Sequence, residues 1–222
     1  MKHKTTWLAA VLLSIGSASA QPSSITVTDG TGNTYGAATG IGIDFDSALT
    51  LATAPWTPPL VNGLQYSLNS ISLRDASDST GSVYLGVYST LSSGVMSGFM
   101  GASLNSVDFS TVANGDWAQF NFSGITVTTD NTPGAGSGLL YFGFQSVNTA
   151  TTTMLTDAMH RIDGFGSYSI QDYGNNVIAY GALQTTRALE FQATVTPVPE
   201  PGTCALALGG LGAMTLFRRR KV

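Results

Sequence analysis

Few residues between positions 21 and 197 have side chains suited to catalysis. The single histidine of this region is His160, and Asp157 and Asp163 stand three residues to either side of it, which suggests an acid–base pair. No serine stands in a G-x-S-x-G elbow, and the chain's single cysteine, Cys204, lies near the C-terminus. A lone histidine in a loop is more often a surface or capping residue. We therefore predict no catalytic residue and no enzymatic activity.

Glycoside hydrolysis would require two carboxyl groups facing each other across a groove. Glu190 is the single glutamate before residue 200, and it alternates with Leu189 and Phe191, which predicts an outward-facing strand residue. The aspartates of this region are scattered and form no recognisable pair. A glycan hydrolase is therefore the weakest of the alternative functions.

Oxygen-rich turns are the candidate cation ligands, and we predict no other cofactor. Asp29 opens a D-G-T-G-N turn, and Asp75 and Asp78 stand three residues apart at the end of an expected strand. The first turn lacks the glycine at position six and the glutamate at position twelve of an EF-hand loop. Structural calcium and plain turn chemistry, in which an aspartate bonds its own backbone, are the two interpretations.

Aromatic residues alternate with small or amide residues in three expected strands. Such residues form platforms that can stack on sugar rings while amide groups bond the hydroxyls. This pattern predicts a glycan-binding face, and the alternative is that loops or paired strands cover these side chains. The face would consist of Tyr84, Tyr88, Trp117, Gln119, Asn121 and Tyr141.

Apolar residues recur with period two in short runs, and turn-forming residues separate these runs. The pattern predicts an all-β domain over residues 21–196, built as a two-sheet, jelly-roll-like β-sandwich. One helical turn is expected near residues 154–159. The expected strands include residues 25–28, 71–73, 83–88, 117–122, 125–127, 139–144 and 189–195.

Charge is distributed unevenly along the chain. The region from 21 to 197 contains no lysine, and three arginines against twelve acidic residues give it a formal charge of −9. Because phosphate binding depends on clustered lysine and arginine, we exclude nucleic acid as a partner. The same region contains no cysteine, so its stability has to come from its core.

The first twenty residues have the pattern of a secretory signal peptide. Lys2 and Lys4 precede an apolar run of about ten residues, which is too short to span a bilayer. Ala18 and Ala20 then form an A-x-A cleavage site before Gln21. The sequence therefore predicts export and removal of residues 1–20 by a signal peptidase.

The last 26 residues, 197–222, combine three features in order. A proline-rich stretch contains Val198, Pro199, Glu200 and Pro201, and an apolar run follows over residues 203–217. As a helix this run would be about 22 Å long, so we expect a short and temporary membrane span. The basic residues that end the tail would stop translocation and stay cytoplasmic, namely Arg218, Arg219, Arg220 and Lys221. The alternative is a permanent single-pass anchor.

These three features together resemble the PEP-CTERM sorting domain, over residues 197–221. The resemblance implies recognition by an exosortase, a membrane-embedded cysteine protease of Gram-negative bacteria that make exopolysaccharide. The protein would be anchored transiently in the inner membrane and then reach the cell surface or the medium. The expected role is structural or adhesive in the exopolysaccharide or biofilm layer, with polysaccharide as a partner. A carbohydrate-binding module is the alternative.

Overall fold

The computed structural model describes residues 21–28, 35–38, 40–45, 56–76, 81–92, 95–129, 138–151, 153–155, 157–163 and 187–199. The chain divides into two units, residues 22–196 and the two ends, 1–21 together with 197–222. Among the described residues, no helix has the length and apolar character needed to cross a membrane. The predicted signal peptide and the predicted helix over 203–217 lie outside the described residues.

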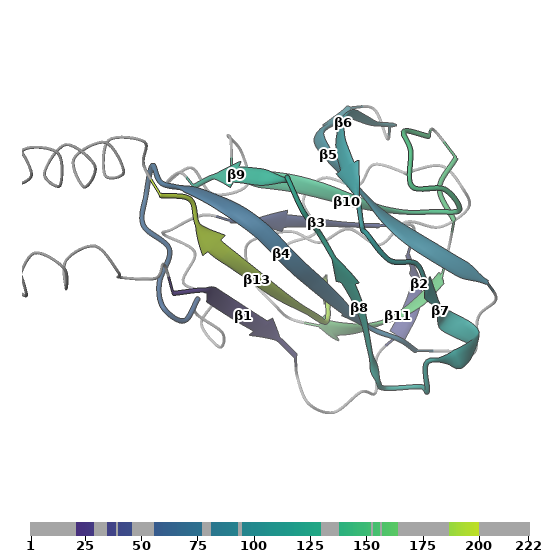
Figure 1. The fold of residues 1–222 in the computed structure, drawn as a ribbon. Helices are drawn as coiled ribbons and strands as arrows, with labels where there is room; N and C mark the ends of the chain where they lie inside the picture. Colours follow the sequence, from purple (N-terminus) through teal and green to yellow (C-terminus); the bar gives the residue numbers. More distant parts are fainter. Residues whose placement is uncertain are drawn as a thin grey trace, which may run out of the picture. The chain divides into compact units, whose positions relative to one another are not determined.

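The described part of the domain consists of two five-stranded antiparallel sheets and a smaller third sheet (Figure 1). The first sheet has the order β1 (Ser23–Val27), β13 (Phe191–Pro197), β4 (Gln65–Arg74) and β8 (Trp117–Asn121), and β9 (Thr126–Thr128) also pairs with β4. The second has the order β3 (Gly40–Asp44), β10 (Leu139–Gln145), β5 (Ser82–Ser92) and β6 (Val95–Ala102), and β7 (Val107–Asp108) pairs with β5.

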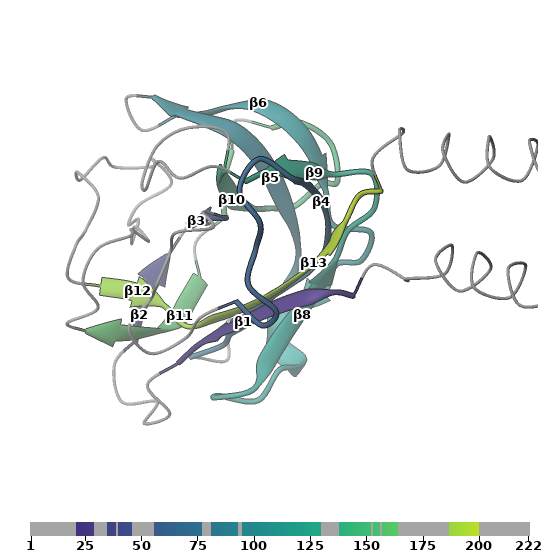
Figure 2. The ribbon, with the colours of Figure 1, turned by 90° about the vertical axis from the view of Figure 1, so that its left-hand side faces the viewer.

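The third sheet has the order β12 (Arg187–Leu189), β11 (Asp157–Asp163) and β2 (Tyr35–Ala38). It lies beside the two larger sheets in the view of Figure 2, where β5 and β6 are the strongly curved strands of the second sheet. A 3₁₀ turn, η1 (Phe109–Thr111), follows β7, and the side chain of Asp108 caps it by accepting a hydrogen bond from the Ser110 amide.

The core lies between the two larger sheets, because alternate residues of each strand point toward the other sheet. Phe122, at the end of β8, meets Phe142 of β10 with ring centroids 6.2 Å apart. Phe109 fills the space between Phe120 and Phe144, at 6.1 and 5.9 Å. The prediction of an all-β fold with two packed sheets is confirmed, and the jelly-roll connectivity stays a prediction.

Two local predictions are wrong. The helical turn expected near residues 154–159 does not form, because Asp157 begins β11 and pairs with Ala38 of β2. Glu190 is not exposed to solvent as predicted. It lies between β12 and β13 at a break in the strand and is fully buried against Arg74.

Candidate functional surfaces and the sorting tail

The predicted processing sites flank two strands that lie side by side. Gln21 stands two residues before β1, and β13 ends at Pro197. The two strands pair antiparallel, with Ser23 opposite Val195, so the domain begins and ends at the same end of one sheet (Figure 1). The predicted signal-peptidase site and the proline-rich motif therefore continue neighbouring strands.

The sorting motif follows β13 directly. Val198 and Pro199 have no regular secondary structure, as expected for alternating prolines. The other predicted processing residues lie outside the described residues, namely Ala18, Ala20, Glu200, Pro201, Arg218, Arg219, Arg220 and Lys221. Their predicted roles are unchanged by the structure.

The predicted aromatic face is not a single surface. Tyr84 and Tyr88 lie on β5, and Tyr141 lies on the neighbouring β10, directly opposite Tyr88. Trp117, Gln119 and Asn121 lie on β8, which belongs to the other sheet. Because the core separates the two sheets, their outer faces point in opposite directions. The prediction that these six residues share one face is therefore wrong.

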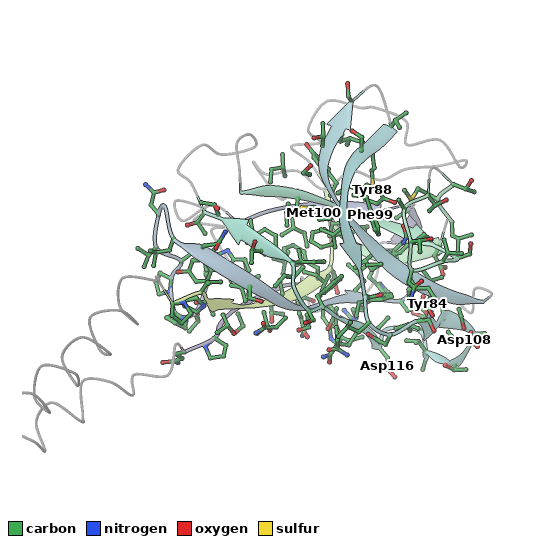
Figure 3. The ribbon with its side chains drawn as sticks, turned by 45° about the horizontal axis from the view of Figure 1, so that its top comes forward. Tyr84, Tyr88, Phe99, Met100, Asp108 and Asp116 are labelled. Atoms are coloured by element: carbon green, nitrogen blue, oxygen red, sulfur yellow. The ribbon has the colours of Figure 1, made fainter. Side chains whose placement is uncertain are left out.

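Tyr88 is also buried, with 2 % of its surface exposed. Its hydroxyl lies 2.9 Å from Oε1 of Gln145 and 3.1 Å from the Thr151 carbonyl oxygen, and burial raises the pKa of this hydroxyl. Its ring packs edge-on against Phe99 at 5.4 Å. Figure 3 shows Tyr88 and Phe99 together, with Tyr84 farther along the strand toward Asp108. Tyr88 thus stabilises the fold and has no free face for a sugar.

Where β5 and β10 pair, the outer face of the second sheet is covered by packed side chains. A Cβ atom at Gly86 would collide with the Gln145 carboxamide, and one at Gly143 would lie 2.6 Å from Sδ of Met154. The Gln145 amide donates hydrogen bonds to the carbonyl oxygens of Val147 and Thr149, at 2.6 and 3.2 Å. Glycine is required at both positions because side chains pack directly on the sheet backbone.

The outer side of β8 remains accessible. Gln119 and Asn121 are exposed, Trp117 is half-buried, and the alternate residues Ala118 and Phe120 are in the core. The Gln119 amide donates a 2.8 Å hydrogen bond to Oδ1 of Asn121. The β8 part of the predicted aromatic face is therefore accessible, with the half-buried Trp117 on the same side of the strand as the exposed amides of Gln119 and Asn121.

An ion pair is buried where β4 meets the β12–β13 break. Nη1 of Arg74 donates to Oε2 of Glu190 at 2.7 Å, and Nε donates to the Gly115 carbonyl at 2.8 Å. The Glu190 carboxylate is fully buried, whereas the Arg74 side chain is 20 % exposed. Replacing Arg74 would therefore remove the ion pair from a buried carboxylate, a loss that costs up to about 3–5 kcal/mol in buried pairs. The sequence contained a signal for this pair, because the domain has only three arginines and one glutamate.

Asp75, Asp157 and His160 lie close to this ion pair. His160 is 3 % exposed on β11, and its Nε2 lies 3.1 Å from Oδ1 of Asn114, so the prediction of a surface or capping role is wrong.

Burial raises the pKa of Asp157 to about 6, partly opposed by a hydrogen bond from the Ala158 amide, and the charge of Asp75 raises it further. Asp75 is 0 % exposed and its backbone bonds Gly115 and Asp116. Asp163 is the last residue of β11, where its backbone lies opposite that of Arg187.

The calcium candidates are not brought together in the described part of the chain. Asp75 is buried, whereas Asp29 and Asp78 lie outside the described residues. Over the ranges that the structure describes, no group of three or more histidine, cysteine, aspartate or glutamate residues could hold a metal ion. Calcium at the 29–33 or 75–78 turns stays a prediction.

Comparison with known proteins identifies the tail. No curated protein and no solved structure was found to match the chain. Residues 197–221 match the family model of the PEP-CTERM protein-sorting motif, which begins at the last residue of β13. The chain therefore carries a PEP-CTERM sorting motif directly after an all-β domain, and this motif indicates a protein that an exosortase sorts to the cell surface.

Proposed function

We propose that this protein is a structural or adhesive component of the extracellular polymer layer, delivered there by an exosortase-like protease and without enzymatic activity. A signal peptidase removes residues 1–20, and the tail holds the protein transiently in the inner membrane. The protein then reaches the cell surface or the surrounding exopolysaccharide.

The observation that supports this proposal best is the direct continuation of β13 into the sorting motif. β13 is a central strand that pairs with β1, so both ends of the domain are fixed at one end of one sheet. A domain tethered at one end presents its remaining surfaces to its surroundings, as a surface or matrix component must.

A hydrolase is less well supported, because the carboxyl groups that could act in catalysis are buried inside the domain. Asp157 has the raised pKa of a general acid and Asp75 acts on it, but Asp75 is 0 % and Asp157 is 6 % exposed. A glycan would have to reach both groups. The ion pair and hydrogen bonds around them instead connect β4 to β11 and β13.

The sorting step is tested by replacing Pro199, Glu200 and Pro201 with alanine together in the full chain. We expect the variant to accumulate in the membrane with its tail, while the wild type appears outside the cell without it. Pro59→Ala, at an exposed loop position of the domain, is the control for loss of a proline and should be sorted normally. Normal release of the triple variant would contradict the proposal.

A further inference from the structure

The outer face of the first sheet is lined by hydroxyl and amide side chains. In β1 and β13, Ile25, Val27, Ala193 and Val195 are in the core, and the alternate residues point outward. Ser24 lies opposite Thr194 and Thr26 lies opposite Gln192 on these two strands. Gln119 and Asn121 of β8 lie opposite Ser72 and Ser70 of β4, of which Ser72 is buried and Ser70 is partly exposed. The face therefore continues across all four strands.

This face has no net charge, in a domain of formal charge −9. No outward residue of β1, β13 or β8 within the described ranges is ionisable. On β4 the charge of Arg74 is balanced by the buried carboxylate of Glu190, 2.7 Å away. A ligand of this face is therefore selected by hydrogen bonding and stacking, and not by charge.

The polar groups of the face are held in place. The Asn69 amide donates a 2.6 Å hydrogen bond to Oγ1 of Thr196, joining β4 to β13, and Gln119 bonds Asn121 along β8. Side chains fixed in this way lose less conformational entropy when a ligand binds. Trp117, directly opposite Arg74, adds a partly exposed ring at one end of the face.

A second protein strand does not fit the edge of this sheet at β8. The Asn105 side chain occupies the edge, because its Nδ2 donates to the Gln119 carbonyl at 2.9 Å and its Oδ1 accepts from the Asn121 amide at 2.8 Å. The Leu104 amide also donates to the Asn121 carbonyl at 2.7 Å. These bonds use the backbone groups that strand addition would need.

We propose that the outer face of the β1-β13-β4-β8 sheet binds a neutral polysaccharide. Sugar hydroxyls both donate and accept hydrogen bonds, as do the hydroxyl and amide groups of this face, and the apolar side of a sugar ring stacks on an aromatic ring such as Trp117. A face four strands wide suits an extended polymer. An acidic polysaccharide is disfavoured by the negative charge of the domain. This inference rests on the proposed function and names its ligand.

The test measures binding of the exported protein to immobilised neutral polymers (cellulose, mannan and dextran) and to acidic alginate. We expect binding to at least one neutral polymer and none to alginate. Trp117→Ala and Gln119→Glu should each weaken the neutral binding about tenfold or more, the first by removing a stacking ring and the second by adding a charge. Gln119 is exposed, so its substitution leaves the core intact.

Tyr84→Ala, on the opposite sheet, is the matched control and should bind like the wild type. Absence of binding to all neutral polymers, equal binding by the Gln119→Glu variant, or preference for alginate would each overturn the inference. A dimer that Gln119→Glu dissociates would also overturn it, because the face would then be covered by a second copy.

The outcomes also distinguish this inference from the proposed function. A protein found in the polymer layer that binds none of these glycans retains the proposed function alone. A protein that binds glycan but stays in the membrane retains this inference alone.

Discussion

A carboxyl group inside a protein ionises less readily than one in water, and Asp157 is such a group. Burial is the largest cause of its raised pKa, and the neighbouring charge of Asp75 adds to it. The surroundings supply one compensating bond to its Oδ1, from the Ala158 amide at 2.7 Å. At the scale of single residues, the stability of the domain should therefore depend on pH through Asp157, at the junction of β4 and β11.

The Asp157→Asn substitution should stabilise the folded protein more at neutral pH than in acid. The carboxyl's ordinary pKa is 3.8 and its folded-state pKa is about 6, so the folded state binds the proton more tightly. Stability from this group is present below pH 3.8 and is lost as the pH rises through about 6, by up to about 3 kcal/mol. Asparagine keeps the acceptor for the Ala158 amide and does not ionise.

Urea unfolding of both proteins at pH 4 and pH 7 measures this effect. The stability difference, variant minus wild type, should increase toward pH 7. Asp116→Asn, at an exposed turn position, is the control for a general effect of removing a carboxylate. A stability difference that is the same at both pH values would show that the Asp157 carboxyl is not desolvated in the folded protein.

At the scale of elements, packed side chains cover the outer side of the second sheet where β5 and β10 pair, and Tyr88 lies at the centre of this cluster. Its hydroxyl connects β5 to Gln145 of β10 and to the Thr151 carbonyl in the segment that follows β10. Tyr84 occupies the same side of the same strand, is only half-buried and has no such bond. The two tyrosines therefore form a natural comparison.

Tyr88→Phe should lower the free energy of unfolding by about 1 kcal/mol, the usual net value of a hydrogen bond, because it leaves the Gln145 carboxamide without this partner. Tyr84→Phe should change it by less than about 0.5 kcal/mol. Denaturant unfolding of the two variants measures both values. Equal effects at the two positions would mean that the hydroxyl of Tyr88 is not buried beneath the segment after β10.

Alternation along strands was predictable from the sequence, because one face of each strand faces the core. Val83, Leu85 and Val87 point inward as expected, as do the apolar residues of β8 and β10. The order of strands was not predictable, since it depends on pairing between distant segments. Periodicity alone therefore could not show that β5 and β8 belong to different sheets.

The buried polar residues were the other failure of prediction. Glu190 alternates with apolar neighbours like a surface residue, and only its distant partner Arg74 makes a buried position favourable. Gln145 likewise has the sequence pattern of an outward strand residue. It is buried because the carbonyl oxygens of residues 147 and 149 fold back to accept its hydrogen bonds.

At the scale of the whole protein, the two outer faces of the described part of the domain differ in their side chains. The face over β5 and β10 is packed with tyrosine, methionine and glutamine side chains, whereas the face over β1, β13, β4 and β8 is polar, partly exposed and without net charge. The sorting motif continues one strand of the polar face. Sorting and the proposed glycan contact thus depend on the same sheet.

The intact mass of the protein recovered from the cell exterior tests the central claim most directly. The account predicts a chain that starts at Gln21 and ends within residues 197–201, which would establish export, removal of the signal peptide and cleavage at the sorting motif. Mass in excess of that chain would identify attached sugar or an anchor on a protein sorted as proposed. A mass that still includes Arg218 to Val222 would contradict the account, because the tail would then be a permanent membrane anchor.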